Sequence, residues 1–309
     1  MRHVFVMDPV EAILVDLDST FALMCEAQKR GHEVYVSLMS GLSLDRGRAM
    51  VRAALATLKP VQGEHAQLGA WVDLDLADAD VVWMRKDPPF NMDYIFATYI
   101  LDKAAEETRI VNAPAGLRNM NEKTWAMKFP ELVPETLITQ DMAQLRAFTE
   151  ELGAVVVKPL DGNGGDGVFL VRRDDPNIGV ILETSTAHGS IKVMAQRYLP
   201  EAKAGDKRII LIDGVARGAL NRVPMGVDHR GNMHVGARVE AASIDSRDQQ
   251  ICDAIGPELR EAGQLFVGID VIGGWLTEVN VTSPTGIHEI NRFDGTCLEA
   301  ELLDAVEVT

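Results

Sequence analysis

A glycine-rich segment between two strand-like runs constrains this chain most. Residues 154–172 read AVVVKPLDGNGGDGVFLVR, and Gly162, Gly164 and Gly167 match the spacing G-x-G-x-x-G. In the dinucleotide-binding motif of this spacing, a helix follows the glycines and its N-terminus holds a pyrophosphate. Here the β-branched and aromatic residues 168–171 follow, so we expect a flexible loop between two strands. A Walker-type loop is excluded because no Gly-Lys-Ser/Thr follows.

Lys158 ends the first of these strands, directly before a proline and the glycines. A loop that opens no helix can hold a phosphate only through its own N–H groups and a nearby cation. A lysine at a strand end is usually a solvated surface charge, but this position favours phosphate binding. The segment is therefore predicted to cover a phosphate group, with Lys158 as its cation.

The composition limits what the chain can bind. Its 309 residues include 46 acidic and 30 basic side chains, which give a formal net charge of −16. Nucleic-acid binding is not expected because it needs a basic face, and an anionic ligand must meet local cations or a metal. The three cysteines are isolated, which predicts neither a disulfide framework nor a zinc site and fits a reducing cytoplasm. We expect no signal peptide and no membrane span.

Three domains are expected, at residues 1–120, 121–200 and 201–309. Strand-like and helical patterns alternate in the first, which indicates a doubly wound parallel sheet, whereas residues 41–69 have weak periodicity and are not assigned. The pattern from residue 193 onward is rich in strands. The predicted strands are 3–7, 34–38, 81–84, 193–198, 208–212, 266–272 and 275–281, and the predicted helices are 20–31, 94–106, 143–150 and 246–261.

A candidate metal site lies in FVGIDVIGGWLTEVNVTSPTG, residues 266–286. Glu278 and Asn280 are two residues apart on one predicted strand, so they point to the same face. A carboxylate beside an amide oxygen suits magnesium, which prefers hard oxygen ligands, and Asp270 on the preceding strand could complete the set. The spacing alone fits a solvent-facing polar side of an antiparallel sheet equally well.

The register of these two strands decides whether the three groups converge. A two-residue turn at Gly273-Gly274 would pair Asp270 with Thr277 and turn it away from Glu278. An odd-numbered loop such as 273–275 would pair Asp270 with Glu278. We therefore predict the odd register.

Residues 224–238 read PMGVDHRGNMHVGAR and have the composition of a loop. Structureless loops of about this length are usually functional or disordered. Arg222, Arg230 and Arg238 favour a lid that brings guanidinium groups over a polyanionic intermediate when it closes. A solvated loop fits the length equally well.

Together these features resemble the ATP-grasp superfamily, and in detail the bacterial glutathione synthetases. The resemblance is carried by VMDP (6–9), MRKDPPF (84–90), ATYILD (97–102), NEK (121–123), KPLDGNGG (158–165), GDKR (205–208), FVGIDVIGG (266–274) and LTEVNVTSPTG (276–286). It runs to about residue 290 and is weakest over 41–69. It implies an α/β and α+β architecture, in which a Rossmann-like parallel α/β domain precedes an ATP-grasp fold.

The resemblance implies ligation of γ-L-glutamyl-L-cysteine to glycine, with ATP converted to ADP and phosphate through an acyl phosphate. ATP and two magnesium ions would be needed, with manganese as an alternative metal, and a homotetramer is suggested. Two alternatives stay open: another ATP-dependent carboxylate–amine ligase, and a nucleotide-binding regulator without turnover. The regulator should lack a phosphate lysine or a metal ligand, and the chain has all of them.

The resemblance also assigns roles to individual residues. The ATP contacts would be Lys123, Lys158, Gly162, Gly164, Gly165, Gly167, Gln196, Tyr198, Leu199 and Asp206. The metal ligands would be Asp270, Glu278 and Asn280, and the catalytic cations Lys158, Arg208 and Arg222. The substrate pockets would be lined by Asp18, Ser19, Arg85, Arg208, Arg222, Ser283 and Thr285. Three positions depart from the family pattern: Arg197 in the nucleotide hinge, and Gly286 and His288 at the glycine end.

Overall fold

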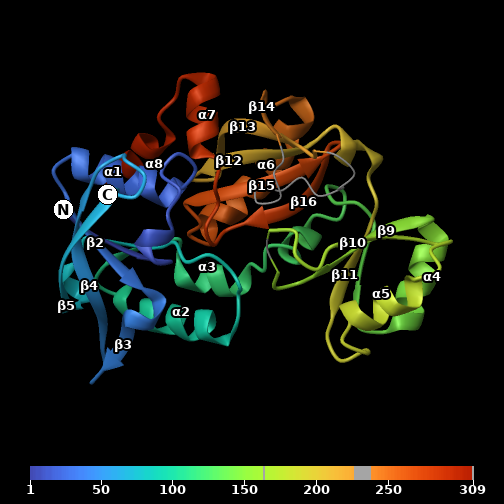
Figure 1. The fold of residues 1–309 in the computed structure, drawn as a ribbon, viewed down its shortest axis with the longest axis horizontal. Helices are drawn as coiled ribbons and strands as arrows, with labels where there is room; N and C mark the ends of the chain where they lie inside the picture. Colours follow the sequence, from blue (N-terminus) through green and yellow to red (C-terminus); the bar gives the residue numbers. More distant parts are fainter. Residues whose placement is uncertain (163, 226–237, 308–309) are drawn as a thin grey trace.

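Three β-sheets follow one another along the chain, and the third lies between the other two (Figure 1). The first sheet is built from strands within residues 2–111, the second from strands within 136–197 and the third from strands within 206–280. Each sheet therefore comes from a continuous part of the sequence.

The computed structural model describes residues 1–162, 164–225 and 238–307. The lid expected at 224–238 falls mostly outside these residues, since 226–237 are not among them. In the part that is described, no helix is both long enough and apolar enough to cross a membrane.

Four strands of the first sheet run parallel, as the alternating pattern predicts. In spatial order they are β2 (Glu33–Leu38), β1 (Arg2–Met7), β6 (Val81–Met84) and β7 (Arg109–Val111). The segments that follow the carboxyl ends of β1 and β6 line the cavity described below. This edge is where open α/β sheets bind their ligands.

Helices cover both faces of this sheet, so the predicted double winding is confirmed. They are α1 (Ser19–Lys29), α2 (Met92–Ala104), α3 (Pro114–Asn119) and, from the far end of the chain, α8 (Leu298–Glu307). Successive residues of β1 face opposite sides: Val4 packs in one core with Tyr94 of α2, whereas Phe5 packs in the other with Phe21 of α1 and Leu302 of α8.

Three antiparallel strands extend this parallel sheet beyond β2. They are β3 (Leu42–Asp45), β4 (Arg48–Leu58) and β5 (Ala66–Asp75), and β4 pairs with β2. Most of β5 is exposed on both faces. Only residues 66–69 of β5 fall in the unassigned stretch 41–69. In that stretch β4 buries mainly alanines and its alternation breaks at Ala53-Ala54, so the apolar pattern is weak.

The second sheet is antiparallel and carries the glycine-rich loop. Its strands are β10 (Phe169–Arg172), β9 (Ala154–Pro159), β11 (Val193–Arg197) and β8 (Thr136–Thr139), in that spatial order. Helix α4 (Met142–Leu152) begins at Asp141, whose carboxylate accepts two backbone N–H groups, and Gly153 ends it with φ 79°. The predicted helix over 143–150 is therefore confirmed, whereas α5 (Ile178–Ser185) was not predicted.

The third sheet is also antiparallel. Its strands, in order, are β14 (Arg238–Ala242), β13 (Val215–Val223), β12 (Asp206–Ile212), β15 (Phe266–Ile272) and β16 (Trp275–Asn280), and its helices are α6 (Ser246–Glu261) and α7 (Ile287–Asp294). The prediction of α6 is confirmed, and a capping box between Asp245 and Asp248 explains where it begins. Strands β13 and β14 were not predicted.

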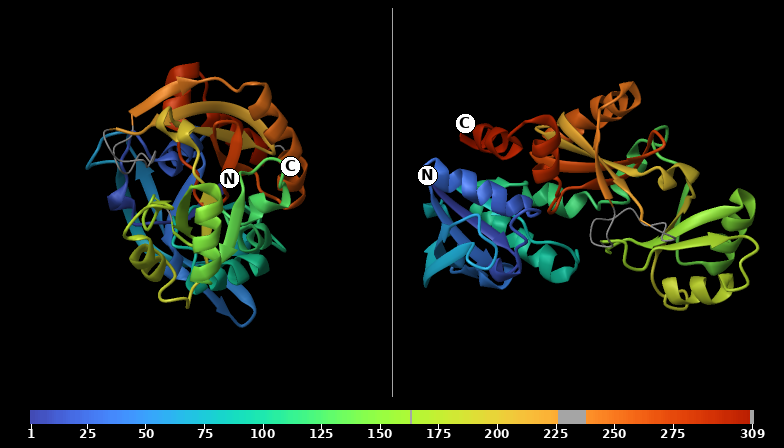
Figure 2. Two further views of the ribbon diagram at one scale, coloured as in Figure 1. Left: turned by 90° about the vertical axis from the view of Figure 1, so that its right-hand side faces the viewer. Right: turned by 45° about the horizontal axis from the view of Figure 1, so that its top comes forward.

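The last helix joins the two ends of the chain (Figure 2). Arg30, at the end of α1, lies 2.8 Å from Asp304 and 2.9 Å from Glu307 of α8, and Glu307 also lies 2.9 Å from His32. These contacts attach the first sheet to the C-terminal part of the chain, which places both beside the same cavity.

Candidate active site

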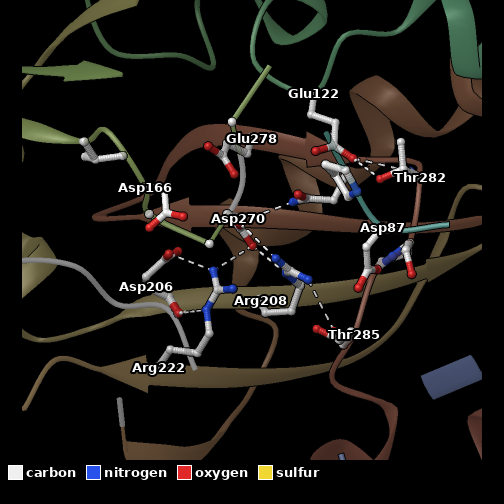
Figure 3. A pocket seen from close by; sticks show the side chains of 18 of the residues that line it. Asp87, Glu122, Asp166, Asp206, Arg208, Arg222, Asp270, Glu278, Thr282 and Thr285 are labelled. Atoms are coloured by element: carbon white, nitrogen blue, oxygen red, sulfur yellow. Dashed lines mark hydrogen bonds and ion pairs between the residues drawn. The ribbon is translucent and has the colours of Figure 1, made fainter. Parts of the chain in front are cut away.

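A cavity of about 600 Å³ opens where parts of all three sheets meet (Figure 3). Its wall takes segments after β1 and β6, the β9–β10 loop, the segment after β11, and strands of the third sheet. The predicted site residues that line it are Asp18, Arg85, Lys123, Lys158, Gly162, Gly164, Gly165, Gln196, Tyr198, Leu199, Asp206, Arg208, Arg222, Asp270, Glu278, Asn280, Ser283 and Thr285.

Ser19 and Gly167 were predicted to contact ligands but lie outside this lining. Ser19 is buried in the first turn of α1, and its hydroxyl accepts the Ile287 N–H at 3.5 Å. Gly167 has φ 69°, and a Cβ there would lie 3.3 Å from Cγ of Pro159. Both residues therefore shape the backbone around the cavity.

Asp270 pairs with Glu278, so the predicted register is confirmed. The predicted odd-numbered loop is wrong, because the turn is the two-residue Gly273-Gly274 with φ 57° and 79°. The register instead shifts by one residue between Asp270 and Val271, where Thr277 is the additional residue on β16. A β-bulge of this kind turns the following side chains to the other face.

Asp270, Glu278 and Asn280 consequently face one cavity. The Asn280 amide donates to Asp270 Oδ2 at 3.3 Å. Among the described residues, no three His, Cys, Asp or Glu side chains are grouped as a metal site, and this set has two carboxylates and one amide. Its donors are nevertheless hard oxygens, so the set fits a magnesium ion.

Two buried arginines hold Asp270. Arg208 contacts both carboxylate oxygens, at 2.5 and 3.1 Å, and Arg222 lies 2.8 Å from Oδ1. Burial alone would raise the pKa of Asp270, but the two guanidinium charges outweigh it and hold the pKa well below its usual range. Asp270 is therefore ionised.

Asp206 is the second carboxylate beside Arg222, at 2.7 Å. Burial raises the pKa of Asp206 to about 7, with Arg222 opposing the rise and Asp270 adding to it. Its Oδ1 is buried and has no hydrogen-bond partner within the described chain. Figure 3 shows Asp206, Arg222 and Asp270 in one hydrogen-bonded row.

Lys123 and Lys158 both lie beside Glu278, the second carboxylate of the candidate metal site. Each Nζ lies 3.7 Å from Glu278 Oε1, and both lysines are buried. Burial lowers the pKa of Lys158, Glu278 opposes this effect, and the charge of Lys123 adds to it. Two ammonium groups that share one carboxylate leave an excess of positive charge, which suits a polyphosphate.

The glycine-rich loop joins β9 to β10 with no helix after it, as predicted. Its Gly162 carbonyl accepts a hydrogen bond from Lys123 Nζ at 2.6 Å. A Cβ on Gly162 would lie 2.7 Å from Cγ of Pro159, closer than side chains tolerate. The loop therefore packs tightly on the strand that carries Lys158.

The segment after β11 forms another part of the wall, with Gln196, Tyr198 and Leu199 in the lining. The Gln196 amide donates to Thr136 Oγ1 at 2.9 Å, so this side chain is held by the second sheet. Arg197 forms an exposed ion pair with Glu135. Arg197 therefore lines the cavity while its guanidinium is held by a surface ion pair.

Two family models cover most of the chain. The N-terminal domain of prokaryotic glutathione synthetase matches residues 1–118, and the ATP-grasp domain of the same enzymes matches residues 122–295. The chain belongs to the prokaryotic glutathione synthetase family. It is 47% identical to glutathione synthetase of Synechococcus elongatus over 99% of this chain and 98% of that protein. The Brucella melitensis enzyme is 48% identical over 97% and 96% of the two chains.

Solved structures with the same architecture confirm the ATP-grasp fold of this family member. D-cycloserine synthetase DcsG has a TM-score of 0.71 and 15% identity, with 99% of this chain and 100% of that chain covered. The ATP-grasp ligase PsnB, complexed with minimal precursor, Mg and ADP, has a TM-score of 0.61 and 17% identity over 99% and 98% of the chains. At these identities, the likeness supports the fold alone.

In this glutathione synthetase family member, the C-terminal part of the chain also supplies residues to the end of the cavity beside the first sheet. Arg208 Nη1 donates to the Thr285 carbonyl at 3.3 Å. His288, in the first turn of α7, lies 3.0 Å from the Asp18 carbonyl through Nε2. His288, which departs from the family pattern, therefore connects the N-terminal and C-terminal parts of the cavity wall. Gly286, the other departure at this end, has φ 120°.

The sequence reasoning missed two carboxylates that line the cavity of this family member, Glu122 and Asp87. Glu122 accepts the hydroxyl of Thr282 at 2.7 Å, and burial raises its pKa. Burial also raises the pKa of Asp87, against a hydrogen bond from Ser283 that lowers it. Both lie in motifs that carried the resemblance, NEK and MRKDPPF, but nothing in their spacing singled them out.

Proposed function

We propose that this protein joins γ-L-glutamyl-L-cysteine to glycine and converts ATP to ADP and phosphate. The observation that carries the proposal is the identity of 45–48% to glutathione synthetases over almost the whole chain. The residues proposed to bind phosphate would suit any ATP-grasp ligase. The similarity over almost the whole chain also covers the segments proposed to bind the peptide substrate.

The chemistry proceeds in two balanced steps. The cysteinyl carboxylate attacks the γ-phosphorus of ATP, the bond to the β,γ-bridging oxygen breaks, and an acyl phosphate and ADP form. The free amine of glycine then attacks the acyl carbon, phosphate leaves with the C–O bonding electrons, and the amine loses its proton. Because water would hydrolyse the acyl phosphate, the cavity must close around it.

Positively charged side chains would stabilise the transferring phosphoryl group. Lys123 and Lys158 lie on one side of Glu278, and Arg208 and Arg222 lie on the other side of the cavity at Asp270. Phosphoryl transfer is catalysed mainly by positioning and by neutralising charge on the oxygens, which these four cations would do. We assign the loop with Gly162, Gly164 and Gly165 to covering the phosphates.

Asp270, Glu278 and Asn280 would hold two magnesium ions, with manganese as an alternative. Such ions neutralise charge on the phosphate oxygens of the nucleotide. The buried arginines keep Asp270 ionised and fix both of its oxygens. The lysines keep Glu278 directed into the cavity, so that both carboxylates are arranged before a ligand arrives.

The adenine end would lie at Gln196, Tyr198 and Leu199, with Asp206 nearby. Gln196, Tyr198 and Leu199 line the cavity beside the second sheet, whereas Asp206 begins β12 of the third sheet. Main-chain groups after β11 would read the adenine edge, so the side chain of Arg197 is free to form its surface ion pair.

We propose a cytoplasmic enzyme that assembles as a homotetramer. The three cysteines form no disulfide, as expected for a reducing compartment. The tetramer is supported by the family resemblance alone, and light scattering of the purified protein tests it.

The reaction is tested by ADP release. Purified protein receives ATP and magnesium, with γ-glutamylcysteine and glycine added singly and together. We expect rapid ADP release only when both are present, with glutathione as the product by mass spectrometry. Release no faster than background with both substrates would contradict the proposal.

A further inference from the structure

Thr277 is the residue of β16 that the strand pairing leaves over. Within 275–280, all of which the structure describes, it alone has no partner on β15. It is 7% exposed, and its hydroxyl donates to the Asp270 carbonyl at 3.1 Å. Its own carbonyl accepts a hydrogen bond from Lys158 Nζ at 3.5 Å. Thr277 therefore connects a proposed metal ligand to a proposed phosphate lysine, directly before a second ligand, Glu278.

The turn that precedes Thr277 is held from outside the sheet. Arg247 Nε, from α6, donates to the Gly274 carbonyl at 2.9 Å. Glu201 packs against Gly273, where a Cβ would lie 2.9 Å from Cγ of Glu201. The turn therefore has little room to change its length or to slide along β15.

Strand β16 is also fixed on both sides of Thr277. On one side, the Leu276 N–H donates to the Leu132 carbonyl at 2.8 Å. On the other side, the Val279 N–H donates to the Glu122 carbonyl at 2.8 Å. Leu276 and Val279 are both buried in the core. Because the strand is held at these points, the extra residue is accommodated locally, at Thr277.

The hydroxyl of Thr277 needs an explanation, because valine has the same shape and also suits a buried strand. A buried hydroxyl is costly unless it is hydrogen-bonded, and this one bonds to the main chain of Asp270. Magnesium demands nearly ideal octahedral geometry, so the spacing of its carboxylate ligands must be exact to a fraction of an ångström. A bond that fixes the bulge also fixes that spacing.

We propose that Thr277 is a positioning residue for the metal and phosphate groups. Its hydroxyl fixes the bulge, so that Asp270 and Glu278 keep the separation that a divalent ion requires, and its carbonyl directs Lys158 toward the same place. This inference rests on the proposed function, since it concerns the ions and phosphates of that site. The effect of Thr277 is exerted through these neighbours and needs no contact with the substrates.

The experiment measures Mn²⁺ binding by electron paramagnetic resonance, on the full chain with the non-hydrolysable β,γ-imido analogue of ATP. Thr277→Val removes the hydroxyl and keeps the shape of the side chain. Loss of one buried hydrogen bond at this position should raise the dissociation constant of Mn²⁺ by about fivefold or more. The KM for ATP should rise by a similar factor.

Thr277→Ser tests whether the hydroxyl is responsible, because it keeps this group and loses a buried methyl. Its melting temperature should fall, but its dissociation constant for Mn²⁺ should stay within about twofold of wild type. If valine is not tolerated, Thr277→Ala against Thr277→Ser repeats the comparison, since these two variants differ only in the hydroxyl.

Thr149→Val is the matched control. Thr149 is fully buried in α4, its hydroxyl donates to the Leu145 carbonyl at 2.8 Å, and it lies outside the cavity lining. This variant should lose melting temperature and bind Mn²⁺ as the wild type does. A residue that acts only through stability would give this result.

The outcomes separate this inference from the proposed function. Wild-type Mn²⁺ affinity in Thr277→Val, or an equal loss of affinity in Thr277→Ser, would overturn the positioning role. No Mn²⁺ binding by the wild type would overturn the metal site together with this inference. Turnover of γ-glutamylcysteine and glycine is measured separately, and its absence beside normal Mn²⁺ binding would overturn the proposed function alone.

Discussion

Asp270 stands opposite Glu278 although a two-residue turn joins their strands. Regular pairing from that turn would direct the two side chains to opposite faces, and the additional residue Thr277 brings them to one face. Thr277 also contributes to the site itself, since its carbonyl lies 3.5 Å from Lys158 Nζ. One local irregularity in β16 thus brings together the acidic groups and Lys158.

Replacing Glu278 with Gln should reduce kcat by at least about a hundredfold, because the group that balances both lysines and is proposed to hold magnesium loses its charge. The melting temperature should fall by only a few degrees. ADP release at saturating magnesium and a thermal melt measure the two effects.

Glu258→Gln is the control for this prediction, since Glu258 pairs with Lys128 at the surface, away from the cavity. It should leave turnover unchanged. Near-normal turnover of the Glu278 variant would remove Glu278 from the metal site.

Replacing Lys158 with Met should lower kcat/KM for ATP by about a hundredfold or more. The change removes the charge proposed to bind phosphate and keeps most of the length of the side chain. The fold should persist, because burial already disfavours the charged form of Lys158. Steady-state kinetics with varied ATP test this.

Lys192→Met, on an exposed lysine in the same part of the chain, is the control and should match wild type. If both lysine variants keep the wild-type ATP dependence, Lys158 does not bind the nucleotide.

A methyl group on Gly162 should disturb the loop. Its Cβ would lie 2.7 Å from Pro159, so Gly162→Ala must shift a carbonyl that Lys123 contacts. We expect turnover to fall by about tenfold or more, from a misplacement of the loop by a fraction of an ångström. ADP release and a melting curve separate this effect from unfolding.

Gly179→Ala provides the contrast. Gly179 lies in helix α5, and a Cβ there would contact only Nη2 of Arg146 in helix α4, at 3.7 Å. It should stabilise the protein by about 0.5–1 kcal/mol with no change in turnover. Equal activity of both alanine variants would show that the loop tolerates a side chain at Gly162.

Stability should fall as the pH drops from 7 to 5 because of His3. It is fully buried, and its Nδ1 accepts the Trp83 indole N–H at 3.1 Å. Burial, assisted by His32, lowers the pKa of His3 to about 4. A histidine with a lowered pKa stabilises the fold above its unfolded pKa of about 6.5, and this contribution is lost as the pH falls through that value toward 4.

The loss from His3 between pH 7 and pH 5 should be about 2 kcal/mol of unfolding free energy. Urea unfolding at the two pH values measures it in wild type and in His3→Gln, which lacks the titrating group. The same pH dependence in both proteins would show that His3 does not titrate as expected.

Local periodicity identified the elements that are buried on one face and have clear ends. Helix α6 begins after a capping Asp245 and was predicted at its observed bounds, and the strand–loop–strand around Gly162 followed from β-branched runs beside glycines. Strand β5 is exposed on both faces and was missed. Strands β13 and β14 were also missed, because their burial does not alternate regularly along the strand.

The sequence by itself determined the residue types of the site: lysines beside a glycine loop, and oxygen donors two residues apart on a strand. Only the tertiary structure decided how they meet. A bulge at Thr277, the ion pairs of Asp270 with Arg208 and Arg222, and the hydrogen bonds of Arg85 to Thr20 and Pro284 join segments far apart in the chain. Hydrophobic spacing is a property of neighbouring residues. Charge balance and desolvation depend on everything that surrounds a group after folding.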